Sequence, residues 1–311
     1  MGATLTAALA NNLDKRFNAV FLADWDKAIA GDLNALNEVC RIDDMPGETD
    51  VRFGEYVTGV ATAPEVVEGA AINYYAMQQG KSVTHTFNTY GIGFNITRKM
   101  RRRDKFDLIK DIAPALAGIV SNTIQTDVYA MFNNAFTTAL DYDSATLCAT
   151  AHTLAGDPVG SGANRPGADV DLTESTAESL ITLMIKTVGE DGQYVKDMPT
   201  RLVAAADNWA TAARVTESMV TTRQGTGESG NAINAVQRKY GISVHASPYL
   251  TDTNAWFFLG KKSPIRLVFE ERPSLVGFWE EMSTGNWKKH VWVSWVTGAD
   301  NWRGVVGTSG A

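Results

Sequence analysis

The chain has 311 residues, of which 44% are hydrophobic and 20% charged, and it carries a net charge of -7. This composition is typical of a packed globular protein and excludes a disordered chain. The length allows one large domain or two ordinary ones. The negative charge argues against general binding of DNA or acidic membranes, because the average field repels them.

The cysteine content and the apolar runs predict a cytoplasmic setting. Cys40 and Cys148 are too few for a disulfide framework or a zinc site, and we expect both to be small buried hydrophobes. No stretch approaches the ~20 apolar residues of a membrane span. The first residues lack the charged start and uninterrupted apolar run of a signal peptide.

The N-terminal segment predicts an arm rather than a closed domain. Residues 3–38 carry Leu, Phe and Val at helical spacing, interrupted at Gly31 and Asp32. Residues 43–50, "DDMPGETD", have the composition of a turn.

Residues 51–97 predict an extended β-hairpin, because Val, Thr, Tyr and Phe partly alternate there. Two runs of alternating residues differ in phase: Val83, His85 and Phe87, then Tyr90, Ile92, Phe94 and Ile96. A bulge or bend with Gly91 and Gly93 would produce this shift. The apolar content between the strands is thin, so we expect the hairpin to pack on something outside its own domain.

A long amphipathic helix follows. Its apolar stripe consists of Ile109, Ile112, Leu116, Ile119, Val120, Ile124, Val128, Met131, Ala135 and Phe136. Pro114 either kinks this helix or marks the start of its straight part, and Asp104 is a candidate N-cap.

A basic run stands where strand meets helix: Arg98, Lys99, Arg101, Arg102, Arg103 and Lys105. Nucleic-acid modules usually interleave such residues with aromatics over a wide face of a basic domain. This cluster is isolated in an acidic chain, so we favour pairing across a subunit boundary over direct DNA contact. The candidate acidic partners are Asp43, Asp44, Glu65 and Glu68, and such contacts fix register more than affinity.

The rest of the chain predicts an insertion followed by a β-rich tail. Residues 141–170 have loop composition, and a helix is expected at 173–188. A buried strand at Leu202–Ala205 leads into a helix, and "AINAVQRKY" and "GISVHASPYL" predict a helix and a strand. From residue 255 strand character returns, which indicates that separate chain segments pair into one sheet.

The sequence contains no recognisable pair of a nucleophile and a base, no metal-binding cluster and no cofactor-binding loop. We therefore expect that the chain is not an enzyme and binds no cofactor. Gly225–Gly230 matches G-x-G-x-x-G, but polar residues rather than a strand precede it. The scattered residues His85, His152, His245 and His290 lack metal-pair spacing. The last strands form a Trp-rich tail, which carries Trp279, Trp287, Trp292, Trp295 and Trp302. Such a tail favours a packed sheet core over a surface on which sugars stack. An enzyme of unknown type and a carbohydrate-binding module remain as alternatives.

The order of these parts resembles the major capsid proteins of tailed bacteriophages, of the Hong Kong 97 (HK97) type. The resemblance is most specific at "YGIGFNITRKMRRRDKFDLIKDIAPALAGIVSNTIQTDVYAMFNN", where a strand runs into the long helix. "CATAHTLAGDP", "RLVAAADNWATAARVTES" and "DTNAWFFLGKKSPIRLVFEE" are similar to segments of the Mu-type head-subunit branch.

The resemblance implies an α+β fold with named parts. These are an N-terminal arm (1–45), an extended β-hairpin loop with its strands (46–97), a spine helix of the peripheral domain (98–140), the peripheral domain (141–199), an axial domain (200–254) and returning strands of both domains (255–311).

It also implies a structural protein of the virion. Pentamers and hexamers of the chain would form an icosahedral shell around double-stranded DNA, assembled in the host cytoplasm without sequence-specific DNA binding. The expected partners are a separate scaffolding protein, a portal protein and a decoration protein. An encapsulin-like bacterial nanocompartment, which shares the fold, is the nearest alternative.

Overall fold

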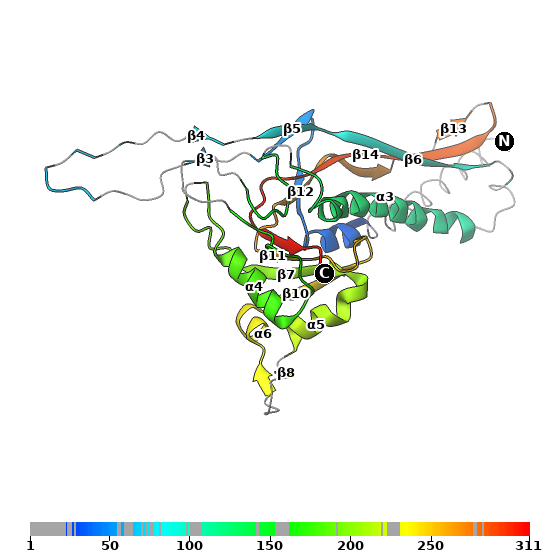
Figure 1. Cartoon of the computed structure of the whole chain (residues 1–311). Helices are drawn as coiled ribbons and strands as arrows, with labels where there is room; N and C mark the ends of the chain where they lie inside the picture. Colours follow the sequence, from blue (N-terminus) through cyan, green and yellow to red (C-terminus); the bar gives the residue numbers. More distant parts are fainter. Residues whose placement is uncertain are drawn as a thin grey trace, which may run out of the picture.

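The computed structural model describes residues 23, 27, 29–54, 57–58, 65–69, 71–72, 74, 78–80, 82–97, 99, 107–140, 143–152, 162–190, 192–218, 220–222, 231–275, 279–281 and 283–311. Among these, no helix is both long and apolar enough to cross a membrane. Two layers built on separate sheets form the body of the molecule, and a long hairpin projects from it (Figure 1).

The larger sheet joins segments from the start, the first third and the end of the chain. Its strands are β1 (Arg41–Asp44), β6 (Asn88–Ile96), β12 (Ile265–Leu275), β13 (Trp279–Glu281) and β14 (Asn286–Ala299). The long strand β14 pairs antiparallel with β12, β13 and β6, and β1 joins parallel to β12. The predicted pairing of distant segments is therefore confirmed.

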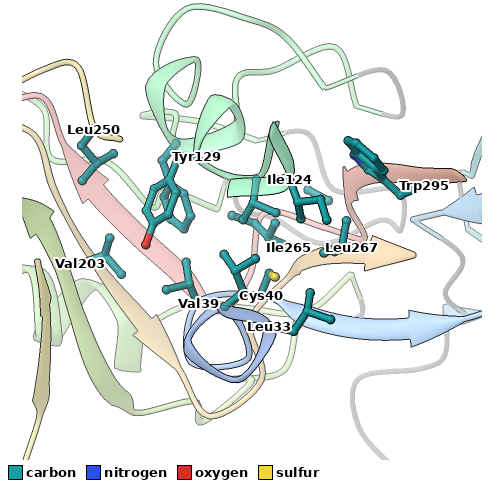
Figure 2. Close-up of a cluster of buried hydrophobic side chains, with 14 of the residues drawn as sticks. Leu33, Val39, Cys40, Ile124, Tyr129, Val203, Leu250, Ile265, Leu267 and Trp295 are labelled. Atoms are coloured by element: carbon teal, nitrogen blue, oxygen red, sulfur yellow. The ribbon is translucent and has the colours of Figure 1, made fainter. Parts of the chain in front are cut away.

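Helix α3 (Asp107–Asn133) covers one face of this sheet, as Figure 1 shows. Leu116, Val120, Ile124 and Val128 of the predicted stripe are buried, whereas Ile119 is half exposed. In Figure 2, Ile124 and Tyr129 of α3 gather with Leu33, Val39, Cys40, Ile265 and Leu267. Pro114 lies within the helix rather than at its start, and Asp104 lies outside the described residues.

The smaller sheet has the order β10 (Ser243–Ser247), β7 (Pro199–Ala205), β11 (Trp256–Gly260) and β15 (Val305–Thr308). Helices α4 (Glu174–Ile185), α5 (Trp209–Glu217) and α6 (Ala235–Tyr240) pack on the face that Leu202 and Phe258 present. The alternate residues Val203 and Phe257 face the main core instead. Because strand side chains alternate between faces, this sheet belongs to both cores and joins the two layers.

Two short elements complete this layer. A 3-10 turn, η1 (Ala206–Asn208), links β7 to α5, and β8 (Val220–Thr222) pairs with β9 (Asn231–Ile233) at the far tip. Helix α4 packs on the smaller sheet, because Ala177, Leu180 and Met184 form an apolar stripe that contributes to that sheet's core.

The projecting hairpin consists of two short antiparallel ladders. Strand β2 (Asp50–Phe53) pairs with β5 (Val83–Thr86), and β3 (Val57–Thr58) pairs with β4 (Gln78–Gln79). These two ladders, which lie within the described residues, confirm the predicted extended hairpin.

The phase shift near residue 88 has a different cause from the predicted bulge. The chain leaves its pairing with β2 at Thr86 and joins β14 from Asn88 onward, and the register from Asn88 to Ile96 is unbroken. A Cβ at Gly91 would lie 2.8 Å from the Trp292 ring, and one at Gly93 would lie 2.9 Å from the Lys289 carbonyl. These glycines permit close approach to β14 rather than a bulge.

Candidate assembly surfaces

The root of the hairpin is fixed to the body. Val51 and Phe53 of β2 pack with Val268 and Val296 on the face of the larger sheet that is opposite α3. The Phe53 ring lies so close to Gly298 that a Cβ there would come within 2.9 Å of it, and the Arg266 guanidinium lies 5.4 Å from its centroid. The hairpin therefore leaves the body from a packed base.

Beyond its root, the hairpin exposes large apolar side chains. Val67 is 70% exposed and Tyr74 is 92% exposed, and Val66 and Ile72 are also exposed. Such a concentration of exposed apolar surface marks an interaction site in a soluble protein. These exposures agree with the predicted thin core of the hairpin, and packing of its apolar side chains on another surface stays a prediction.

The basic run lies mostly outside the described residues. Of its members only Lys99 is described, and it is exposed; Arg98, Arg101, Arg102, Arg103 and Lys105 are not described. Contact of this run with another subunit stays a prediction.

The four acidic candidates divide into two kinds. Asp43 Oδ2 accepts hydrogen bonds from Arg41 Nε at 2.9 Å and Arg266 Nε at 3.0 Å. Asp44 accepts a bidentate pair from Arg272, at 2.7 and 2.8 Å. Glu65 and Glu68, in contrast, are exposed on the hairpin and have no partner among the described residues.

Asp143, His152, Asn164 and Trp302 form a cluster that is buried away from solvent. His152 Nδ1 lies 2.7 Å from Asp143 Oδ2, its Nε2 lies 3.0 Å from Asn164 Oδ1, and its ring stacks on Trp302 at 4.3 Å. The Asn164 amide nitrogen lies within hydrogen-bonding distance of the carbonyl oxygens of Leu147, Trp302 and Val305. Because every member is buried and bonded, the cluster ties loops to β15 rather than binding a substrate.

Sequence reasoning predicted His152 as a strand or loop residue, and it lies in an isolated bridge with Gly162. Nothing in the spacing of Asp143, His152, Asn164 and Trp302 indicated that they meet. Within the described residues, no group of three or more His, Cys, Asp or Glu side chains is placed to hold a metal ion.

The Trp-rich tail contributes two tryptophans to the core. Trp295 and Trp302 are buried, and Trp295 Nε1 donates to Asp127 Oδ2 at 2.9 Å. Trp287 is partly buried, and Trp292 is 46% exposed with its ring against Gly91. The predicted sheet-packing role is confirmed for Trp295 and Trp302, and the glycine run Gly225–Gly230 lies outside the described residues.

A projecting hairpin, a long helix over a five-stranded sheet and a second α/β layer form an α+β fold of the Hong Kong 97 type. Residues 80–307 match the family described as phage capsid protein, and the chain belongs to this family. No curated protein matches the chain.

Solved structures share the fold at low sequence identity. The capsid of cyanophage P-SCSP1u is 11% identical with a TM-score of 0.57, over 88% of this chain and 86% of that one. The capsid of a native GTA particle is 11% identical with a TM-score of 0.55, over 89% and 90%. A virus-like particle from Pyrococcus furiosus is 9% identical with a TM-score of 0.50, over 91% and 98%. These likenesses show the fold.

Proposed function

We propose that this phage capsid protein is the major head subunit of a tailed bacteriophage, and that it assembles into pentamers and hexamers of an icosahedral shell around double-stranded DNA. The family match carries the proposal, and the exposed apolar hairpin supports it. A hairpin seated on an adjacent copy makes a head-to-tail contact, and contacts of that type close into rings.

In this proposal the basic run at 98–105 ties the base of the hairpin and of α3 to the next subunit. Glu65 and Glu68 are its best acidic partners, because Asp43 and Asp44 already bind arginines of their own chain. The acidic net charge of the shell limits adhesion of the packaged DNA.

The proposal extends to partners and setting. Separate scaffolding and portal proteins, and a decoration protein, would act with the chain during assembly in the host cytoplasm. Membership of the Mu-type branch and the division into arm, hairpin loop, peripheral and axial domains belong to the same proposal. The phage family match favours this function over a nanocompartment shell.

The hairpin provides the test. In the double variant Val67→Asp, Tyr74→Asp, two carboxylates enter the proposed apolar contact, and an unpaired charge buried there costs several kcal/mol. We expect the subunit to remain folded, because these side chains are 70% and 92% exposed, but to lose assembly in sedimentation analysis. Tyr74→Phe, which keeps the apolar surface, should assemble normally. Full assembly of the double variant would refute the docking of the hairpin.

A further inference from the structure

Two exposed patches lie at opposite ends of strand β7. The first, which we call the leading patch, immediately precedes the strand and comprises Tyr194, Val195, Lys196 and Met198, with Tyr194 62% and Met198 52% exposed. The second, the trailing patch, follows the strand and comprises Asp207 and Trp209, with Trp209 61% exposed. Seven strand residues at about 3.3 Å each separate the patches by about 23 Å.

The leading patch is held rigidly although it lies in a loop. Asp197 Oδ1 accepts hydrogen bonds from the backbone N–H groups of Met198 at 2.9 Å and Lys261 at 3.3 Å. Arg303 anchors the start of the loop through the Val188 carbonyl at 2.7 Å and Glu190 at 2.9 Å. A fixed loop presents its apolar side chains without the ordering entropy of a mobile one.

Lys196 has a left-handed backbone with φ of 57°. That conformation is costly for a residue with a side chain, and such strain persists where the surroundings hold it and is concentrated at functional positions. Lys196 is exposed and has no charged partner among the described residues.

The trailing patch is equally fixed. Trp209 is the first residue of α5, which packs into the core of the smaller sheet through Ala212 and Val215. The preceding Asn208 donates from its side chain to the Thr253 carbonyl at 2.6 Å. Asp207 is exposed and, within the described part of the chain, has no ion-pair partner.

The leading patch therefore combines three exposed apolar side chains with a lysine, and the trailing patch combines one exposed tryptophan with an aspartate. The two charges have opposite signs, and neither has an ion-pair partner among the described residues. We propose that the leading patch of one copy binds the trailing patch of the next copy, with Lys196 paired to Asp207 and Trp209 packed against Tyr194 and Met198. A contact between two different patches is head-to-tail. After two copies bind, one leading patch and one trailing patch remain free, so further copies add until the ring closes. This inference rests on the proposed shell function and names an interface within it.

A charge swap tests the pairing. Lys196→Asp and Asp207→Lys each place like charges in the contact, which opposes association. We expect each single variant to lower the yield of rings or shells by about tenfold or more, and the double variant Lys196→Asp, Asp207→Lys to restore most of it. Lys239→Glu on α6, an exposed lysine outside both patches, serves as the charge-change control and should assemble as the unmodified chain does.

Mixing the two single variants gives an independent readout. In a 1:1 mixture, each contact between the two different variants pairs opposite charges at positions 196 and 207. An even-numbered ring can consist of such contacts alone, because the two chains can alternate around it. A five-membered ring retains at least one mismatched contact. We therefore expect native mass spectrometry to show rescued even-numbered rings with alternating composition, and few five-membered ones.

The outcomes separate this inference from the proposed function. If the unmodified chain assembles and both single variants assemble equally well, the patch pairing is refuted and the shell function stands. Loss of assembly in the singles without recovery in the double variant or in the mixture also refutes the pairing. If the unmodified chain forms no assembly under any condition, the shell function itself fails.

Discussion

At the scale of single residues, several polar groups connect the two layers of the body. The Tyr129 hydroxyl of α3 shares a hydrogen bond with His245 Nε2 on β10, and His245 Nδ1 lies 3.7 Å from Glu38 Oε2. Burial raises the pKa of Tyr129 to about 12, so its hydroxyl keeps its proton at neutral pH.

This arrangement predicts a loss of stability on acidification. Burial lowers the pKa of His245 below its ordinary value, and Glu38 offsets only part of the effect, while Arg201 adds to it. The folded protein binds this proton more weakly than the unfolded chain does, so the stabilisation is present above the ordinary histidine pKa and is lost as the pH falls through the lowered one.

The measurement is urea unfolding of the unassembled subunit between about pH 7.5 and pH 5. We expect His245→Gln, which cannot titrate, to show a flatter pH dependence of the free energy of unfolding than the unmodified chain. Identical slopes for the two proteins would contradict this account of His245.

At the scale of elements, the glycines of β6 and α3 have opposite expected effects. A Cβ at Gly93 meets the Lys289 carbonyl at 2.9 Å, and that backbone is fixed within the β6–β14 ladder, whereas a Cβ at Gly118 meets nothing within 4 Å. Gly93→Ala should therefore destabilise the subunit by about 1–3 kcal/mol. Gly118→Ala should stabilise it by about 0.5–1 kcal/mol, because alanine favours a helix interior.

Chemical denaturation of both variants against the unmodified chain measures these changes. Gly91→Ala is an informative companion, since the three atoms nearest its Cβ all belong to the ring of Trp292, a side chain that is 46% exposed. We expect its cost to be smaller than that of Gly93→Ala. The reverse order, or equal tolerance of both, would show that the β6–β14 ladder adapts more than this packing implies.

The elements also show what a sequence can predict. Regular spacing of Leu116, Val120 and Ile124 predicted the buried face of α3, and alternation predicted β6, because those patterns are local. The pairing of β6 with β14, nearly two hundred residues later, has no local signal. The phase shift at residue 88 was visible in the sequence, but its cause, a change of partner strand, required the fold.

The candidate surfaces were likewise predicted only where the sequence carries a local signal. The thin apolar content of the hairpin indicated an outside partner, and the exposure of Val67 and Tyr74 agrees with it. The leading and trailing patches were not predicted, because Tyr194 and Trp209 resemble core residues until the fold leaves them exposed. Asp43 and Asp44 illustrate the converse, since acidic residues that looked available bind arginines from the distant strand β12.

At the scale of the whole molecule, the described residues form a body in which β7 and β11 contribute to both cores. The hairpin projects from one side of this body, and β7 lies in the smaller sheet (Figure 1). In the proposed function, the hairpin and the patches at the two ends of β7 make repeated contacts between copies of the chain.

Negative-stain electron microscopy of the purified chain, expressed alone and then together with its neighbouring genes, tests the proposed shell function. We expect closed angular shells, or discrete five- and six-membered rings, in at least one of the two preparations. A monodisperse monomer in both preparations would contradict the shell function.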